Sequence, residues 1–191
     1  MVNILQFMPA HFDASLIYAG SYSPAWVIIS VLLAIFTAYA ALIASARIDN
    51  LHDNVSRLTW SLISTLTLGA GIWGMHFIGM LALNLPCSVK YDPFITFISM
   101  IPGVLASGIA LGVVWQGTKF LSPLVRSVLL GAGIGTMHYT GMAAMRLEGF
   151  VRYDPSLLVL SIFVAIALSY IALRVKDGMI GLKMRNYALV A

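Results

Sequence analysis

Residues 69–82 read GAGIWGMHFIGMLA, and residues 131–144 read GAGIGTMHYTGMAA. Nine of these fourteen positions are identical, at a constant offset of 62 residues. The same offset aligns residues 89–93 with residues 151–155, and both of these segments end in Tyr-Asp-Pro. Residues 22–24, Tyr-Ser-Pro, resemble a third copy of that turn. Self-similarity at a fixed period predicts a supersecondary unit that packs against its own copies.

The composition is that of a membrane protein. Of 191 residues, 60% are hydrophobic and 9% are charged, whereas a soluble domain carries about 25% charged residues. This excludes most soluble enzymes and any protein that binds nucleic acid through a dense basic face. A transmembrane helix needs about 20 apolar residues. Five stretches without Asp, Glu, Lys or Arg reach or approach that length: Pro24–Ala46, Leu58–Leu85, Pro93–Gln116, Ser127–Met145 and Pro155–Leu173.

We therefore predict an all-α polytopic bundle in a lipid bilayer, built from repeated two-helix hairpins. It has five full spans and the start of a sixth, which begins at Asn186 and either lies at the surface or marks the chain as a fragment. A third Met-His pair is expected near position 200, one period after His138. The predicted organisation is a leader at 1–21 and a membrane domain at 22–191, with repeats at 22–88 and 89–150 and a partial third at 151–191.

The basic residues are distributed unevenly between the two sides of the predicted bundle. The loops after spans 1, 3 and 5 carry eight of them, and the other side carries three. The positive-inside rule places the first set in the cytoplasm and the N-terminus outside. The first set is Arg47, Arg57, Lys119, Arg126, Arg174, Lys176, Lys183 and Arg185; the second is Lys90, Arg146 and Arg152.

The recurrent turns and glycines have structural explanations. The Ser or Asp of each turn is predicted to cap the helix that follows, and the proline suits the first helical position. The Gly-Ala-Gly segments are predicted to let helices approach closely, because small residues favour close packing in membranes. Pro102 is predicted to kink the third span.

Two histidines, His76 and His138, lie inside predicted spans, where ionisable residues are costly and usually face the bundle interior. Each is followed by a methionine four residues later on the same helical face and is preceded directly by another. Imidazole and thioether ligands suit copper better than hard cations. The sequence therefore predicts a copper site shared by the two repeats, near the outer face. The candidate ligands are His76, Met75, Met80, His138, Met137 and Met142; Gly79 and Gly141 would leave space beside them, and Tyr139 and Thr140 could bind a small ligand.

Three other interpretations remain open. The histidines could bind haem between the second and fourth spans, they could belong to a copper transporter, or they could simply form hydrogen bonds between helices. A transporter should have ligands at several depths, whereas these cluster near one face. The sequence has no evident Ser-His-Asp arrangement, pair of interior carboxylates or phosphate-binding loop, so an enzyme is not expected.

The motif Met137-His138-Tyr139-Thr140 resembles that of the MHYT domain, an integral membrane sensor module of bacteria, and residues 75–78 are a degenerate copy. The resemblance implies six spans plus a linking seventh in the cytoplasmic membrane, with three Met-His motifs near the external face. It also implies copper binding and the sensing of oxygen, nitric oxide, carbon monoxide or redox state. Such domains are often fused to cytoplasmic diguanylate cyclase and phosphodiesterase domains for cyclic di-GMP. A homodimer is left open.

Overall fold

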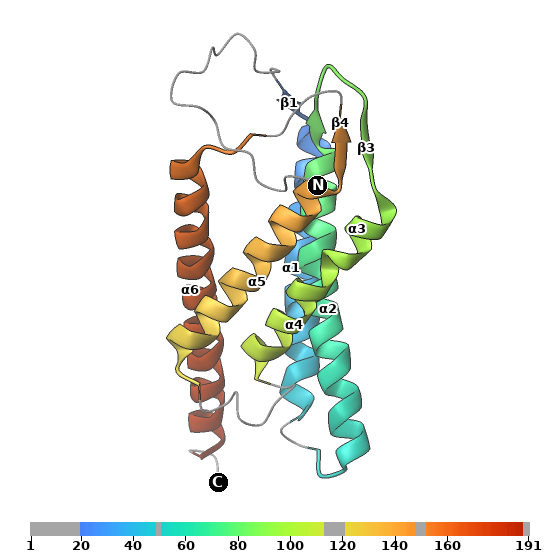
Figure 1. The fold of residues 1–191 in the computed structure, drawn as a ribbon. Helices are drawn as coiled ribbons and strands as arrows, with labels where there is room; N and C mark the ends of the chain where they lie inside the picture. Colours follow the sequence, from blue (N-terminus) through green and yellow to red (C-terminus); the bar gives the residue numbers. More distant parts are fainter. Residues whose placement is uncertain (1–19, 49–50, 113–120, 148–151, 189–191) are drawn as a thin grey trace.

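A computed structural model describes residues 20–48, 51–112, 121–147 and 152–188; for 176, 177 and 179–188 it describes the backbone alone. The described chain is a helical bundle with short antiparallel strands gathered at one end, which we call the strand end (Figure 1). Most of the expected leader lies outside the described residues. The elements are β1 (Ser21–Tyr22), α1 (Pro24–Arg47), α2 (Asn54–Leu81), β2 (Leu83–Asn84), β3 (Val89–Tyr91), α3 (Pro93–Ile98), α4 (Met100–Leu111), α5 (Pro123–Ala143), β4 (Met145–Leu147) and α6 (Pro155–Ala188).

Large apolar side chains face outwards along the helices, as expected for a bundle surrounded by hydrocarbon. Phe36 of α1 is 69% exposed and Phe163 of α6 is 68% exposed. Within the described residues, four helical stretches are long and apolar enough to cross a membrane: α1, α2, residues 93–111 and residues 155–175. The predicted fourth span also forms a helix, α5, of 21 residues, but its glycines and polar side chains make it less apolar than the others.

Successive helices pack in the order α1, α2, α4, α5, α6, so that α2 lies between α1 and α4, and α5 between α4 and α6. At the strand end, β1 pairs with β2 and β3 with β4, both antiparallel. The backbone N–H of Ser23 donates to the carbonyl of Ala82 at 2.8 Å, and that of Asp92 donates to the carbonyl of Ala144 at 2.8 Å. Because Ala82 and Ala144 are 62 residues apart, the sequence repeat is also a structural repeat.

The first Gly-Ala-Gly segment, in α2, touches a different neighbour with each glycine. A Cβ atom added at Gly69 would lie 2.9 Å from the backbone nitrogen of Val104 in α4. One added at Gly71 would overlap the side chain of Thr37 in α1. The two glycines therefore allow α2 to approach both flanking helices, because a side chain at either position would separate them.

The second Gly-Ala-Gly segment repeats this arrangement in α5. A Cβ atom at Gly131 would lie 2.8 Å from Cγ1 of Ile166 in α6. One at Gly133 would overlap the Cβ atom of Ala106 in α4 and lie 2.9 Å from the carbonyl oxygen of Pro102. Ile166 is 62 residues after Val104, so the same contacts recur one period later. The prediction that these glycines permit close packing is confirmed.

The third predicted span is divided, and it ends earlier than expected. Residues 93–116 were expected to form one kinked helix, but α3 ends at Ile98 and α4 begins at Met100. The ring of a proline clashes with the carbonyl four residues earlier, which for Pro102 is that of Ile98, so the proline explains the interruption. Helix α4 then stops at Gly112, whose φ of 70° is left-handed; Gln116 lies outside the described residues.

Other boundaries also differ from prediction. Helix α2 begins at Asn54 and not at Leu58, and α5 runs from Pro123 to Ala143 and not from Ser127 to Met145, because the arginines that bounded the predicted spans lie in the first turns of these helices. Helix α2 was expected to continue to Leu85 but ends at Leu81, because residues 83–84 pair with β1. The fifth span was expected to end at Leu173, with a separate apolar piece from Asn186. Instead, α6 continues to Ala188. Residues 174–188 contain no proline. Gly178 and Gly181 weaken a helix, but the Lys, Leu, Met and Arg residues around them favour it, and the helix continues.

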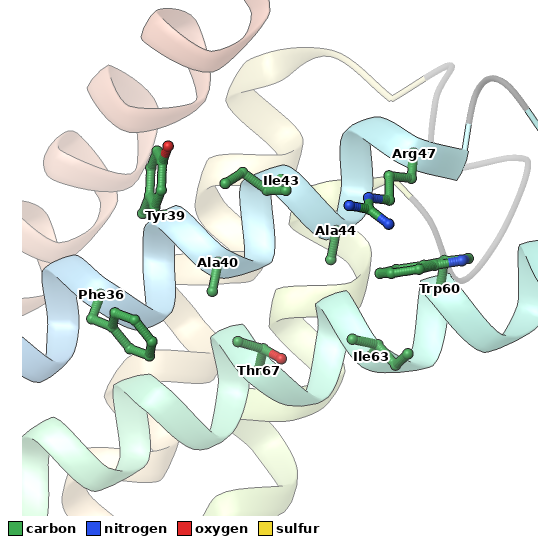
Figure 2. Close-up of a pocket in the computed structure, with 9 residues that line it drawn as sticks. All are labelled: Phe36, Tyr39, Ala40, Ile43, Ala44, Arg47, Trp60, Ile63 and Thr67. Atoms are coloured by element: carbon green, nitrogen blue, oxygen red, sulfur yellow. The ribbon is translucent and has the colours of Figure 1, made fainter.

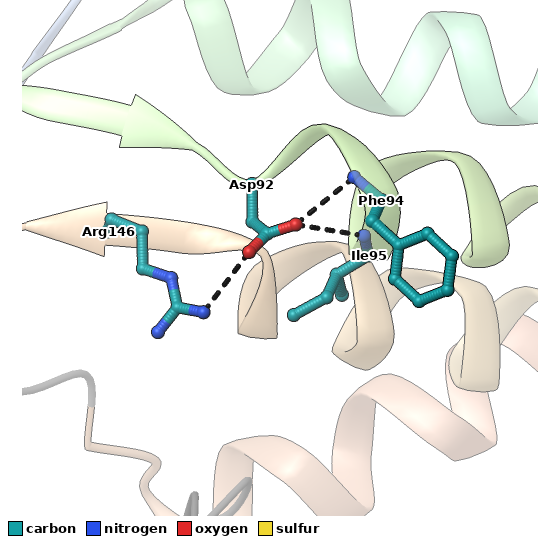
Figure 3. A network of polar contacts seen from close by, with 4 residues as sticks. All are labelled: Asp92, Phe94, Ile95 and Arg146. Atoms are coloured by element: carbon teal, nitrogen blue, oxygen red, sulfur yellow. Dashed lines mark hydrogen bonds and ion pairs between the residues drawn. The ribbon is translucent and has the colours of Figure 1, made fainter.

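The capping prediction is right at two turns and wrong at the third. Asp154 accepts hydrogen bonds from the N–H groups of Ser156 at 2.7 Å and Leu157 at 3.1 Å. Asp92 accepts them from Phe94 at 3.1 Å and Ile95 at 3.2 Å (Figure 3). The side chain of Ser23 makes no capping hydrogen bond; at that turn the backbone bond to Ala82, the residue after α2, holds the chain.

The side chain of Asp92 also connects the start of α3 to β4, the second strand of the same repeat. Its other carboxylate oxygen accepts from Nη2 of Arg146 in β4 at 3.2 Å (Figure 3). The backbone N–H of Ile95, together with this guanidinium, holds the pKa of the Asp92 carboxyl below its usual range. The ionised carboxylate therefore stabilises both the start of α3 and the β3–β4 pair.

We predict that Asp92→Ala lowers the melting temperature by a few degrees, and that Asp92→Asn, which can still cap a helix, lowers it less. Because the folded-state pKa is depressed, the contribution is fully present above the ordinary pKa and is lost as the pH falls through the depressed value. Thermal unfolding followed by circular dichroism across this acidic range checks both statements. If the melting temperatures of the wild type and Asp92→Asn depend on pH in the same way, the statement about the loss of the Asp92 contribution at acidic pH is wrong.

Candidate metal centre

The two histidines of the repeat meet between α2 and α5. The Nδ1 atoms of His76 and His138 are 3.3 Å apart, and the ring centroids are 4.8 Å apart, edge to face at 69°. Each histidine stands five residues before the end of its helix, at Leu81 or Ala143, so both lie near the strand end. The repeat therefore places equivalent residues of two hairpins at one point.

Two kinds of chemistry fit this nitrogen pair. One imidazole can donate a hydrogen bond to the other, provided that they adopt opposite tautomers at Nδ1. Alternatively, both nitrogens can bind one metal ion. Imidazole nitrogens bind ions such as zinc at about 2.0–2.1 Å, so two that share an ion lie no more than about 4 Å apart. The observed 3.3 Å satisfies that limit.

The second nitrogen of His76 is buried without a hydrogen-bond partner among the described residues. It lies against α5 at Gly141, where an added Cβ atom would be 2.9 Å from Nε2. Gly141 thus provides the space that the imidazole occupies. Its counterpart, Gly79, has no described atom within 4 Å of an added Cβ atom and faces open space. A buried imidazole nitrogen that finds no protein partner is expensive. This nitrogen is not the one that faces His138, so a metal bound through Nδ1 would leave it without a partner.

The four candidate methionines are not equivalent. Met137 is fully buried, and its Cγ would lie 3.6 Å from a Cβ atom added at Gly103 in α4, so its side chain begins against that helix. Met75, Met80 and Met142 are half-buried. The described residues contain no cluster of three or more His, Cys, Asp or Glu that could hold a metal. A metal at this place would need sulfur ligands, or ligands from outside the described residues.

Aromatic rings surround the histidine pair on both sides. Phe77 lies edge-on to His76 with ring centroids 5.2 Å apart, and Tyr139 lies edge-on to His138 at 5.0 Å. The Tyr139 hydroxyl is 2.9 Å from Oγ of Ser161 in α6, and its ring contacts Tyr153 at 5.5 Å. Tyr153 lies outside the spans. Its burial and, as a smaller effect, the nearby Tyr139 raise the pKa of its hydroxyl.

The other predicted lining residue, Thr140, is engaged within its own helix. Its hydroxyl donates to the carbonyl of Thr136 at 2.7 Å. With the Tyr139 hydroxyl bonded to Ser161, both polar groups that were expected to bind a small ligand already have partners in the protein. They can serve a ligand only by exchanging those bonds.

Trp73 connects the histidine helix to the interrupted third span. Its Nε1 donates to the carbonyl of Thr96 at 3.0 Å and lies 3.1 Å from Oγ of Ser99. Ser99 and Ser161 occupy the same position in two repeats, so Trp73 and Tyr139 contact equivalent serines from α2 and α5. The serine that recurs after each turn proline marks one partner of these contacts, but the sequence does not show which residue reaches it.

Two other chemically reactive side chains among the described residues lie elsewhere, and His11 lies outside the described residues. His52 precedes α2, at the far end of that helix from His76. Cys87 is a free thiol between β2 and β3, half-buried. Neither joins the histidine pair.

These features define a class of protein: a membrane bundle of repeated helical hairpins with a histidine contributed by each repeat to a common site. The chain belongs to the MHYT family, described as a bacterial signalling protein N-terminal repeat, whose profile matches residues 69–126 and 131–188. The two matches begin 62 residues apart, as the internal repeat requires.

Relatives with assigned names are signalling proteins. The chain is 38% identical over 83% of its length to the bifunctional diguanylate cyclase/cyclic di-GMP phosphodiesterase MucR of Pseudomonas aeruginosa. It is 36% identical over 92% of its length to the cyclic di-GMP phosphodiesterase NbdA of the same species. It is 31% identical over 81% to the signaling protein YkoW of Bacillus subtilis. The chain spans 24%, 22% and 19% of these relatives respectively, less than a quarter of each. No solved structure matches the chain significantly.

Proposed function

We propose that the chain is the membrane sensory domain of a cyclic di-GMP signalling protein. The family match supports the sensory role, and the names of MucR and NbdA support the output. The relatives continue far beyond the region that they share with this chain. The output would be a diguanylate cyclase or phosphodiesterase domain on the cytoplasmic side of the bacterial inner membrane.

We propose that the domain holds one copper ion between His76 and His138. The observation that carries this proposal is the 3.3 Å approach of their Nδ1 atoms from two repeats. Met80 and Met142 stand one turn after the histidines on the same helical faces, where thioethers can complete a soft ligand set; Met75 and Met137 are further candidates. When bound, copper supplies a centre that takes up a diatomic gas or changes its redox state.

The protein's part is to convert a change at this pair into a helix movement. His76 belongs to α2 and His138 to α5, and the two helices otherwise meet mainly through α4. A change in the distance that the pair prefers would therefore move α2 relative to α5. Trp73 and Tyr139 would pass the movement through their serine contacts to the junction of α3 and α4 and to α6. Such coupling requires a ligand with different affinities for the two arrangements.

The orientation follows from charge. The end opposite the strands carries Arg47, Arg57, Arg126 and Arg174, and we call it the basic end. The strand end carries Lys90, Arg146 and Arg152. The positive-inside rule places the basic end in the cytoplasm and the histidine pair near the outer face, with the N-terminus outside.

Haem and transport receive less support. A porphyrin held by two axial histidines lies between their rings, and a 3.3 Å separation of ring nitrogens leaves no space for it. A copper carrier needs ligands at successive depths, whereas the described histidine pair stands near one end of the bundle.

Elemental analysis of protein loaded with Cu(I) and then desalted tests the proposal, and we expect about one copper ion per chain. The absorption spectrum of the same sample should have no Soret band. A chain that retains no copper would contradict the metal assignment, and a Soret band would favour haem in its place. Neither outcome tests the sensory assignment, which rests on the family match.

A further inference from the structure

An apolar groove lies between α1 and α2 toward the basic end, far from the histidine pair. Its volume is about 360 Å³, within the range of roughly 300–1,000 Å³ that is usual for ligand sites. Small side chains, Ala40 and Ala44 on α1 and Thr67 on α2, form part of its lining. Because Ala40 and Ala44 are four residues apart, they lie on one face of α1 and leave a continuous hollow along it.

The groove opens to the outside of the bundle. Three apolar side chains that line it are exposed: Phe36 by 69%, Ile43 by 43% and Ile63 by 42%. In a bilayer these side chains face hydrocarbon, so the natural occupant is an acyl chain that enters sideways. Figure 2 shows Phe36 at one end of this row and Arg47 at the other.

The end of the groove nearest the membrane boundary is cationic. The Arg47 guanidinium lies 4.7 Å from the centroid of the Trp60 ring (Figure 2). This cation–π contact holds the guanidinium in place, and its planar N–H groups remain suited to binding an oxyanion with two hydrogen bonds. In the described parts of the chain, Arg47 has no ion-pair partner.

The surrounding charge favours an anion. Arg57 and Arg126, in the first turns of α2 and α5, and Arg174 near the same end of α6 add positive charge. Two acidic residues of the described chain lie toward this end. Asp53 accepts a hydrogen bond from the N–H of Ser56 at 2.8 Å as the cap of α2, and Asp177 follows Arg174 by three residues in α6. An anionic headgroup at Arg47 would therefore be attracted, whereas a neutral headgroup would gain less from this field.

We propose that this groove binds one anionic phospholipid, with an acyl chain along Phe36, Ile43 and Ile63 and the phosphate on Arg47. The site is independent of the histidine pair and of any metal. It would fix α1 against α2 at the end that leads to the cytoplasm, and it would make the packing of the first hairpin depend on the lipid composition of the membrane.

Native mass spectrometry of the detergent-purified protein, titrated with phosphatidylglycerol or phosphatidylcholine, tests the charge recognition. The wild type should retain one phosphatidylglycerol in preference to phosphatidylcholine. Arg47→Gln should weaken phosphatidylglycerol binding about tenfold, the order expected when a charge-assisted contact is lost. Arg174→Gln removes an equal charge from the same end outside the groove and should bind as the wild type does. Equal binding of the two lipids by the wild type, or equal weakening by both variants, would overturn the proposal.

A second pair of variants tests the position of the acyl chain. Ile43→Trp fills the groove with a larger side chain at an exposed position, whereas Ile171→Trp places the same bulk on the exposed surface of α6. Ile43→Trp should weaken phosphatidylglycerol binding, and Ile171→Trp should not. Matching circular dichroism spectra and elution volumes would establish that both variants are folded. Unchanged binding in folded Ile43→Trp would overturn the placement.

Discussion

His76→Ala and His138→Ala should each reduce the copper content of the protein from about one ion per chain to a small fraction of that. The two imidazoles meet at 3.3 Å through Nδ1, so either substitution leaves one nitrogen at a site that needs two. Loss of a group that merely orients a ligand already weakens metal binding about 10–100-fold, and loss of a ligand itself should exceed this. Elemental analysis after equilibration with a competing chelator measures the effect.

His52→Ala is the matched control for this experiment. It removes an imidazole that is exposed before α2, at the opposite end of that helix from His76. Its copper content should equal that of the wild type. If all three variants retain the same copper as the wild type, neither His76 nor His138 is a ligand, and their contact is a hydrogen bond between helices.

Gly133→Ala should destabilise the bundle by about 2 kcal/mol, the range that overpacked cores show. The added methyl would overlap the Cβ atom of Ala106 and stand 2.9 Å from the carbonyl oxygen of Pro102. A methyl on Cα and a backbone carbonyl cannot rotate aside, so α5 must move away from α4. Thermal unfolding in detergent, followed by circular dichroism, measures the loss.

Gly135→Ala provides the comparison within the same helix, two positions later. No described atom lies within 4 Å of its added methyl, and alanine is favoured over glycine in a helix by up to about 1 kcal/mol. This variant should be as stable as the wild type or slightly more so. Equal destabilisation by both substitutions would show that glycine serves the backbone of α5 and not its contact with α4.

The sequence predicts the start of a helix where a proline of the recurrent turn marks it, and misses the starts of α2 and α5 by four residues each. Pro24, Pro93 and Pro155 each begin a helix as expected, because a proline at the first helical position is a local signal. The ends depend on partners far away in the chain: α2 stops where β2 pairs with β1, and Ser23 is held by Ala82 and not by a cap of its own. The helix propensities of the residues contain no information about these pairings.

The histidine pair shows how far a repeat can go toward predicting a site. Equivalent residues of packed repeats are placed by the same local rules, so the offset of 62 already brought His76 and His138 to equal depth. The bonds of Trp73 to Thr96 and of Tyr139 to Ser161 connect different residue types in the two copies. A comparison of the copies therefore could not predict them, because it detects what the copies share.

X-ray absorption at the copper edge tests most directly whether the two repeats hold one shared ion. Copper-loaded wild type should show the outer-shell scattering of two imidazoles, and His76→Ala and His138→Ala, loaded with excess copper, should each show one imidazole fewer. Imidazole scattering that is the same in the wild type and both variants would contradict the account, because copper would then be bound without the pair that joins α2 to α5.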